Sequence, residues 1–245
     1  MLIALLLLAI LVGASLQRLT GMGFALVSAP FMVLLLGPVS GVVTANICGA
    51  TASALILGRV VADIEWRKFA GLALAALVGV IPGALLLKVA PAAWLDVGIG
   101  ALIIAGLSIT LFARPRPGDP GAGTMFAAGA ASGGMSVLAG VGGPAMSVYA
   151  VATRWGQKGF AATMQPYFMV TSLASISAKA VTNPASFPDL PAWAWIAVCL
   201  AMVLGLVAGE WAAKHVTHDA GRLLVVILAF AGGAAAMVRG AAALL

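Results

Sequence analysis

Apolar residues fill most of this chain in long runs that short polar breaks interrupt. The runs cover residues 1–20, 23–36, 39–58, 69–88 and 94–112, and then 125–139, 143–153, 159–179, 192–213 and 223–238. A run of roughly 20 apolar residues is long enough to cross a bilayer as an α-helix. The runs 23–36 and 143–153 are shorter, and each follows a glycine-rich turn. The pattern predicts an all-α polytopic membrane protein in which these two runs belong to broken or re-entrant helix hairpins.

Composition excludes several other classes of protein. Of the 245 residues, 63% are hydrophobic and 8% are charged, whereas a soluble domain carries about 25% charged residues. The 13 Lys and Arg residues are scattered, so we expect no nucleic acid partner. The two cysteines lie in apolar runs without metal-ligand spacing, so we expect no disulfide, no metal and no cofactor. We predict a multi-pass protein of a bacterial inner (cell) membrane, surrounded by the lipid bilayer, with the first run retained as a span.

One polar segment divides the chain into two similar halves. Residues 114–120 contain three prolines and three charged side chains, so they cannot be helical and must be solvated. We assign residues 1–113 to a first membrane repeat, 114–124 to a cytoplasmic linker and 125–245 to a second membrane repeat. The repeat rests on residue pairs at an offset of 119: Gly21 with Gly140, Gly23 with Gly142, Ser28 with Ser147, and Asn46 with Gln165.

A second set of glycines has the spacing of closely packed helices. Gly79 and Gly83 match Gly205 and Gly209 at an offset of 126, because the loop around residues 183–188 is longer in the second half. Glycines four residues apart let two helices approach closely. We expect these glycines to be packing sites, with the face of a homodimer as the alternative.

Loop charges predict that the second half is inverted relative to the first. If each half crosses the bilayer an odd number of times, nine cations collect on the side of the linker: Arg59, Arg67, Lys68, Arg114, Arg116, Arg154, Lys158, Lys214 and Arg222. The other side receives Lys88, Lys179 and Arg239. Because cytoplasmic loops carry an excess of Lys and Arg, we expect the linker to be cytoplasmic and both termini to be outside.

The two glycine turns are the strongest candidates for a binding site. A glycine turn that leads into a new helix presents backbone N–H groups at a helix N-terminus, which attracts anions. Two such breaks in an inverted repeat would meet near the bilayer midplane, where secondary transporters bind substrate; hinges without a ligand are the alternative. We expect a small anion to be bound by residues of the turns and their flanking helices: Arg18, Thr20, Gly21, Gly23, Asn46, Gly140, Gly142, Gly143 and Gln165.

Three of these side chains have a second interpretation. The guanidinium of Arg18 suits an oxyanion, but it could equally snorkel to the cytoplasmic interface. Asn46 and Gln165 either point at one cavity or simply bond a neighbouring helix.

Two charged residues outside this set also have alternatives. Lys179 is expected to anchor the outer interface, with assistance in anion release as the second role. Glu210 lies four residues before Lys214, which predicts a helical ion pair; a proton-coupling role is the alternative.

With these residues in view, the chain resembles the TauE/SafE sulfite exporter family. The resemblance extends over nearly the whole chain, because both halves open with a Gly-x-Gly turn and the second reads Gly140-Val141-Gly142-Gly143-Pro144. It implies export of sulfite, sulfonates or related small sulfur-containing anions, driven by an ion gradient or by the membrane potential. The first turn departs from the richer glycine run that is usual in the family, since Phe24 and Ala25 follow Gly23.

We therefore expect a secondary transporter that exports a small anion by alternating access, and not an enzyme. An intramembrane enzyme, the first alternative, would need a nucleophile with a base or a metal cluster, and no histidine lies in an apolar run. A membrane assembly or structural factor, the second alternative, would not require glycine breaks at matched positions.

The predicted orientation can be tested with single cysteines in a chain whose Cys48 and Cys199 are replaced by Ala. Gly118→Cys should react with a membrane-impermeant thiol reagent only from the cytoplasmic side, and Ser186→Cys only from outside, because of the charge asymmetry. Labelling of Gly118→Cys from outside in intact cells would contradict the orientation.

Overall fold

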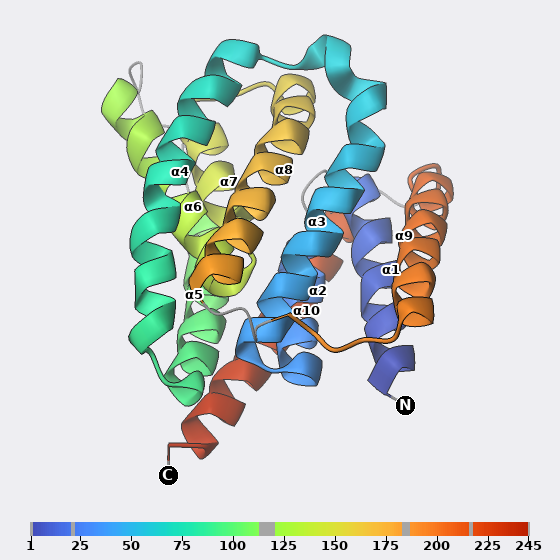
Figure 1. Cartoon of the computed structure of the whole chain (residues 1–245). Coiled ribbons are helices and arrows are strands. Elements are labelled where there is room, and N and C mark those ends of the chain that lie inside the picture. The colour runs from blue at the N-terminus through green and yellow to red at the C-terminus, as the bar shows by residue number, and fades with distance from the viewer. Residues whose placement is uncertain (1, 21–22, 113–120, 183–186, 216–217, 245) are drawn as a thin grey trace.

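The computed structural model describes residues 2–20, 23–112, 121–182, 187–215 and 218–244. Within these ranges the chain forms ten α-helices, one short 3-10 turn and no strand (Figure 1). The helices are α1 (Leu2–Thr20), α2 (Gly23–Leu36), α3 (Pro38–Val60), α4 (Trp66–Val89), α5 (Ala92–Phe112), α6 (Ala122–Ala139), α7 (Gly143–Ala152), α8 (Gln157–Thr182), α9 (Ala192–Ala212) and α10 (His218–Ala242), with η1 (Val61–Asp63) after α3. Each apolar run coincides with one helix, which confirms the all-α class.

Helix length and composition agree with a membrane protein. Among the described residues, five helices are long and apolar enough to span a bilayer: α3 with η1, α4, α5, α9 and most of α10. The shorter α7 has 10 residues, which corresponds to about 15 Å, or half of the hydrocarbon core. The chain is a multi-pass membrane protein.

Two helix breaks fall where the glycine-rich turns predict them. α1 ends at Thr20 and α2 begins at Gly23, while Gly21 lies outside the described residues. Between α6 and α7, Gly140 has a φ of 72°, a left-handed conformation that glycine adopts without steric cost. Pro144 then sits in the first turn of α7, where its missing N–H is not needed.

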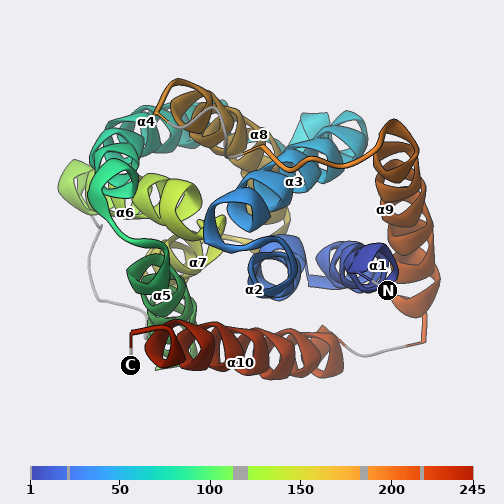
Figure 2. The ribbon, with the colours of Figure 1, turned by 60° about the horizontal axis from the view of Figure 1, so that its bottom comes forward.

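The most closely packed helix pairs each join one helix of the first half to one of the second. α4 lies against α6, α1 against α9, α3 against α8, and α5 against α10 (Figure 2). Exchanging α1–α5 for α6–α10 leaves this set of pairs unchanged. α3 and α8 also run in opposite directions along their contact (Figure 1). This is the pattern that the predicted inverted repeat requires, and the repeat itself stays a prediction.

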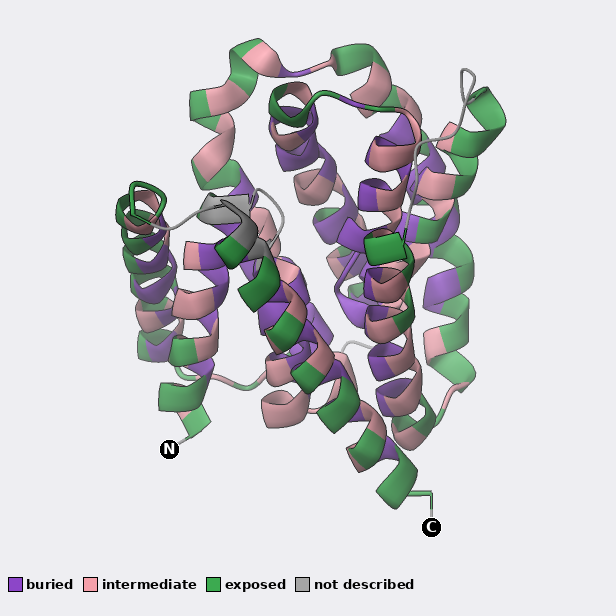
Figure 3. Ribbon diagram, turned by 180° about the vertical axis from the view of Figure 1, so that it is seen from behind, coloured by how far each residue is buried: buried purple, intermediate pink, exposed green. Residues whose placement is uncertain are grey.

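Both halves share one hydrophobic core. Its largest cluster includes Leu6 of α1, Val27 of α2, Ile103 of α5 and Met202 of α9, all almost fully buried. On the outer helices the buried residues face inward and the exposed ones face outward (Figure 3). On α4, for instance, the outward face consists of exposed apolar side chains: Leu74, Val78, Ile81 and Leu85. Apolar side chains on this surface suit contact with lipid tails.

Helix ends separate the cationic residues as the charge pattern predicts. The end of α3 and the starts of α4, α6 and α8 lie at one end of the molecule, and both termini lie at the other (Figure 1). Arg59 and Lys68 belong to the first end, and Lys88, Lys179 and Arg239 lie in last turns at the second. Following the predicted orientation, we call these the cytoplasmic end and the outer end.

A partly buried ion pair joins α5 to α10 at the outer end. Arg239 donates two hydrogen bonds to the carboxylate of Asp96, at 2.6 and 2.9 Å, and a third to the carbonyl of Leu34 at 2.8 Å. The Asp96 side chain is only 8% exposed, so each charge neutralises the other where water is scarce.

The small residues of α4 and α9 are packing sites within one chain. A Cβ at Gly79 would overlap the carbonyl of Ala130 on α6, and one at Gly205 would overlap the carbonyl of Leu11 on α1. These contacts confirm the predicted helix packing. Because α6 and α1 cover these glycines, they are not available as the face of a homodimer.

Substitution of Gly79 by Leu should therefore destabilise the fold. Overpacking a close helix contact costs typically 1–3 kcal/mol, so the thermal unfolding midpoint in detergent should fall. Gly98→Leu on α5 is the matched control, because a Cβ there meets nothing within 4 Å. Equal midpoints for the two variants would contradict the tight α4–α6 contact.

Candidate functional site

A small cavity lies where the glycine turn of the second half meets helices of the first. Its volume is about 30 Å³. Its lining comes from α1, α2 and α3 on one side and from α6, the turn before α7, and α8 on the other: Gln17, Phe24, Ala25, Leu26, Ala45, Gly49, Ser53, Ser136, Gly140, Val141, Gly142, Gly143, Phe168 and Ser172. Three of the predicted site residues, Gly140, Gly142 and Gly143, are in this lining.

The turn is held in place by α6. The hydroxyl of Ser132 donates to the carbonyl of Gly142 at 2.8 Å, and the N–H of Gly140 donates to the carbonyl of Ser136 at 2.9 Å. These bonds direct the start of α7 toward the cavity. The first N–H groups of a helix have no partner within the helix, so they can donate to an anion there.

Asn46 is joined to the cavity through a neighbour. Its amide donates to the carbonyls of Val42 at 2.9 Å and Ser136 at 3.2 Å, and it accepts a bond from the Ser136 hydroxyl at 3.2 Å. Ser175 of α8 also donates to the Ser136 carbonyl, at 3.4 Å. Asn46 is 1% exposed and does not line the cavity, so it positions Ser136, which does.

Gln165, the repeat partner of Asn46, also lies outside the lining. Its amide donates to the carbonyl of Ala161 at 3.0 Å, and its Oε1 is buried without a partner among the described residues. A role in substrate binding stays a prediction for both amides. Thr20 and Gly23 are placed only as the last residue of α1 and the first of α2.

Gln17 and two serines are site residues that the sequence analysis missed. Gln17 is 4% exposed, and its Oε1 has no hydrogen-bond partner in the described part of the chain. Ser53 and Ser172 face the same cavity from α3 and α8. The offset of 119 pairs Gln17 with Ser136 and Ser53 with Ser172. A search for polar residues at both positions of a repeat pair would therefore have found these side chains.

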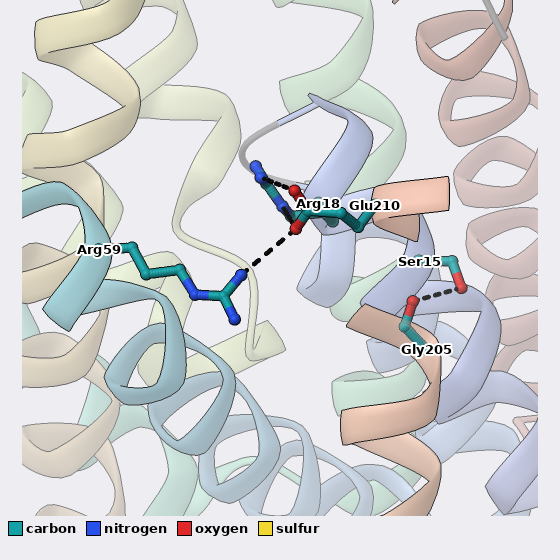
Figure 4. Close-up of polar contacts among 5 residues, drawn as sticks. All are labelled: Ser15, Arg18, Arg59, Gly205 and Glu210. Atoms are coloured by element: carbon teal, nitrogen blue, oxygen red, sulfur yellow. Dashed lines mark hydrogen bonds and ion pairs between the residues drawn. The ribbon is translucent and has the colours of Figure 1, made fainter. Parts of the chain in front are cut away.

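Arg18 lies beside the cavity residues in sequence but forms an ion pair elsewhere. Its Nε and Nη2 donate to the two carboxylate oxygens of Glu210 at 2.8 and 2.9 Å, and Arg59 reaches the same carboxylate at 3.3 Å (Figure 4). The partner of Glu210 is thus Arg18, and not Lys214 as the helical spacing suggested. The guanidinium geometry of Arg18 matches a carboxylate better than an ammonium does, which accounts for the difference.

This ion pair borders a groove of about 600 Å³ between α3 and α9 at the cytoplasmic end. Arg18, Arg59, Glu210 and Lys214 are its charged residues, and aliphatic side chains and Trp211 form the rest of the lining. Close by, the hydroxyl of Ser15 donates to the carbonyl of Gly205 at 2.9 Å and joins α1 to α9 (Figure 4).

Within the ranges that the structure describes, no group of three or more His, Cys, Asp or Glu side chains could hold a metal ion.

A comparison with protein families places the chain in one of them. The family model described as sulfite exporter TauE/SafE matches residues 5–236, which include the cavity, the groove and part or all of every helix. No curated protein and no solved structure matches the chain.

The Arg18–Glu210 contact predicts coupling between the two substitutions Arg18→Gln and Glu210→Gln. Each should lower the thermal midpoint of the purified protein, and the double variant should lose less than both single losses together, because either change already breaks the pair. Arg18→Gln with Lys158→Gln is the control and should be nearly additive, because Lys158 pairs with Asp63 and not with Glu210. Additive losses for Arg18 and Glu210 would show that the pair is not formed.

Proposed function

Since this chain belongs to the TauE/SafE sulfite exporter family, a family of membrane transporters of sulfur-containing anions, we propose that it exports a small sulfur-containing anion such as sulfite across a bacterial inner membrane. The observation that carries the proposal is the cavity between the two halves, bordered by the glycine turn at the start of α7. A transporter that works by alternating access needs a site of this kind at the junction of its repeats.

The lining suits an anion. It combines a helix N-terminus with the hydroxyls of Ser53 and Ser172 and the amide of Gln17. Among the described residues of the lining, none is acidic. Donors without an opposing carboxylate stabilise negative charge, most strongly where water is excluded.

Two aromatic rings limit the size of the ligand that the cavity takes, which favours sulfite over larger organosulfonates. Phe24 and Phe168 line the cavity with the small residues, and a larger substrate would have to displace these rings.

The entrance for the anion is the cationic groove at the cytoplasmic end. Arg18, Arg59 and Lys214 outnumber Glu210 there, so the groove raises the local concentration of anions. Arg18 attracts the anion into this groove, and the residues of the cavity then bind it. No specific observation favours an intramembrane enzyme or an assembly factor.

The proposal is tested by counterflow of labelled sulfite into proteoliposomes that contain the purified protein and unlabelled sulfite. We expect accumulation of label that empty liposomes lack, and weaker accumulation with a larger sulfonate as the internal ion. Absence of counterflow with every sulfur oxyanion tried would reject the proposed function.

Gln17→Met should weaken sulfite binding while keeping the volume and helix propensity of the side chain. Loss of a hydrogen bond to a charged group costs about 1.5–3 kcal/mol, so the half-saturating concentration should rise about ten- to a hundredfold. Gln157→Met, at the exposed start of α8, is the matched control. An unchanged concentration in Gln17→Met would remove this amide from the site.

A further inference from the structure

The two ends of the molecule differ at positions that the predicted repeat makes equivalent. The repeat relates α9 to α4 and α3 to α8, so the α3–α9 and α4–α8 contacts are counterparts. In the structure α4 packs along α8, whereas α9 scarcely touches α3. The groove of about 600 Å³ occupies the space between α3 and α9. One of the two equivalent contacts is therefore open and the other is closed.

The closed contact is apolar where the open one is charged. The offsets of 119 and 126 relate Arg18 to Val137, Arg59 to Ala178 and Glu210 to Ala84. These three counterparts all belong to one hydrophobic cluster, completed by Val80, Leu87, Leu138 and Ala174. Such a cluster seals the outer side without any ion pair that would have to be broken.

Lys179 is buried at this seal. It follows Ala178, and the offset of 119 relates it to Val60, which lines the open groove. Lys179 is 1% exposed, and its Nζ has no hydrogen-bond partner within the described ranges. The structure thus contradicts the expectation that it anchors the outer interface, because a snorkelling lysine would expose its ammonium group.

Burial of an ammonium group without a partner is costly. An apolar side chain at position 179 would pack against this cluster without the free-energy cost of removing a charge from water. Ionisable groups retained inside membrane proteins belong by default to substrate or ion pathways.

A polar stripe on α8 connects Lys179 to the cavity. Ser172, Ser175, Lys179 and Thr182 are spaced by three or four residues, which places them on one face of the helix. Ser172 lines the cavity, and Ser175 donates to the carbonyl of Ser136, another lining residue. The hydroxyl of Thr182 is buried without a partner in the described structure. The stripe runs from the cavity to the outer end of the helix.

We propose that Lys179 binds the exported oxyanion on the outer half of its path, in a groove that opens when α4 and α6 move away from α8. This inference rests on the proposed function. In the outward-open form the counterpart of the α3–α9 groove exists between α8 and α4, and the ammonium group of Lys179 lies in its wall. The anion passes from the cavity along Ser172 and Ser175 to Lys179. In the present form the apolar cluster covers this site.

Sulfite exchange measured from the two sides of the membrane tests the role of Lys179. Lys179→Gln should raise the half-saturating concentration of sulfite on the outer side about ten- to a hundredfold, the range expected for loss of a charge-assisted bond, and change the cytoplasmic-side value much less. Lys179→Arg should retain most of the outer-side affinity. Lys88→Gln, an exposed cation at the same end, is the control. Unchanged outer-side affinity in an active Lys179→Gln protein would overturn the proposal, as would an equal rise on both sides.

A second measurement does not depend on sulfite. In a background with Cys48→Ala and Cys199→Ala, we expect Val137→Cys, fully buried in the closed contact, to react from outside with the anionic reagent methanethiosulfonate ethylsulfonate. Leu6→Cys on α1, fully buried in another cluster, should stay unlabelled. If the wild-type protein shows no sulfite counterflow, the proposed function fails while labelling still reports the outer groove. If counterflow is normal but Val137→Cys is never labelled, the outer groove is wrong and the proposed function stands.

Discussion

The fold depends on one requirement: a helix that breaks inside a membrane must find partners for its freed backbone groups within the protein. At the turn between α6 and α7, Ser132 and Gly140 meet this requirement with two hydrogen bonds. The left-handed Gly140 lets the chain leave α6 sharply, and Pro144 allows α7 to begin at once. The turn can face a cavity only because both halves of the chain enclose it. The site is therefore a product of the interleaved packing and does not belong to either half.

Much of the fold is local enough to be predicted from the sequence. Apolar runs locate the ten helices of the described residues, since segment length and hydropathy decide what can cross a bilayer. Glycine and proline locate the breaks, because their backbone properties act within a few residues. The small-residue spacing on α4 and α9 predicts tight packing, although the partner helices, α6 and α1, become known only from the structure.

The candidate site was predicted less completely, for physical reasons. The backbone of the second turn was identified because glycine carries the signal itself. Glu210 was assigned to Lys214 because a spacing of four is visible in sequence, whereas its bonds to Arg18 span 192 residues. Which face of a helix is covered depends on its neighbours, so the burial of Lys179 could not be read from its place near a helix end. Gln17 could not be recognised from matching residue types in the repeat, because its counterpart Ser136 is a different residue type and its burial depends on neighbouring helices.

The contact between Asp96 and Arg239 has a consequence for the making of the protein. The two residues are 143 positions apart, and Arg239 lies in the last turn of the last helix. During synthesis Asp96 enters the membrane long before the guanidinium that will neutralise it has been translated. The carbonyl of Leu34, which accepts a hydrogen bond from the same guanidinium, also lacks this partner until then. Insertion of α10 is thus the step that supplies the counter-charge of Asp96, and a chain arrested before this step carries an uncompensated acid at the start of α5.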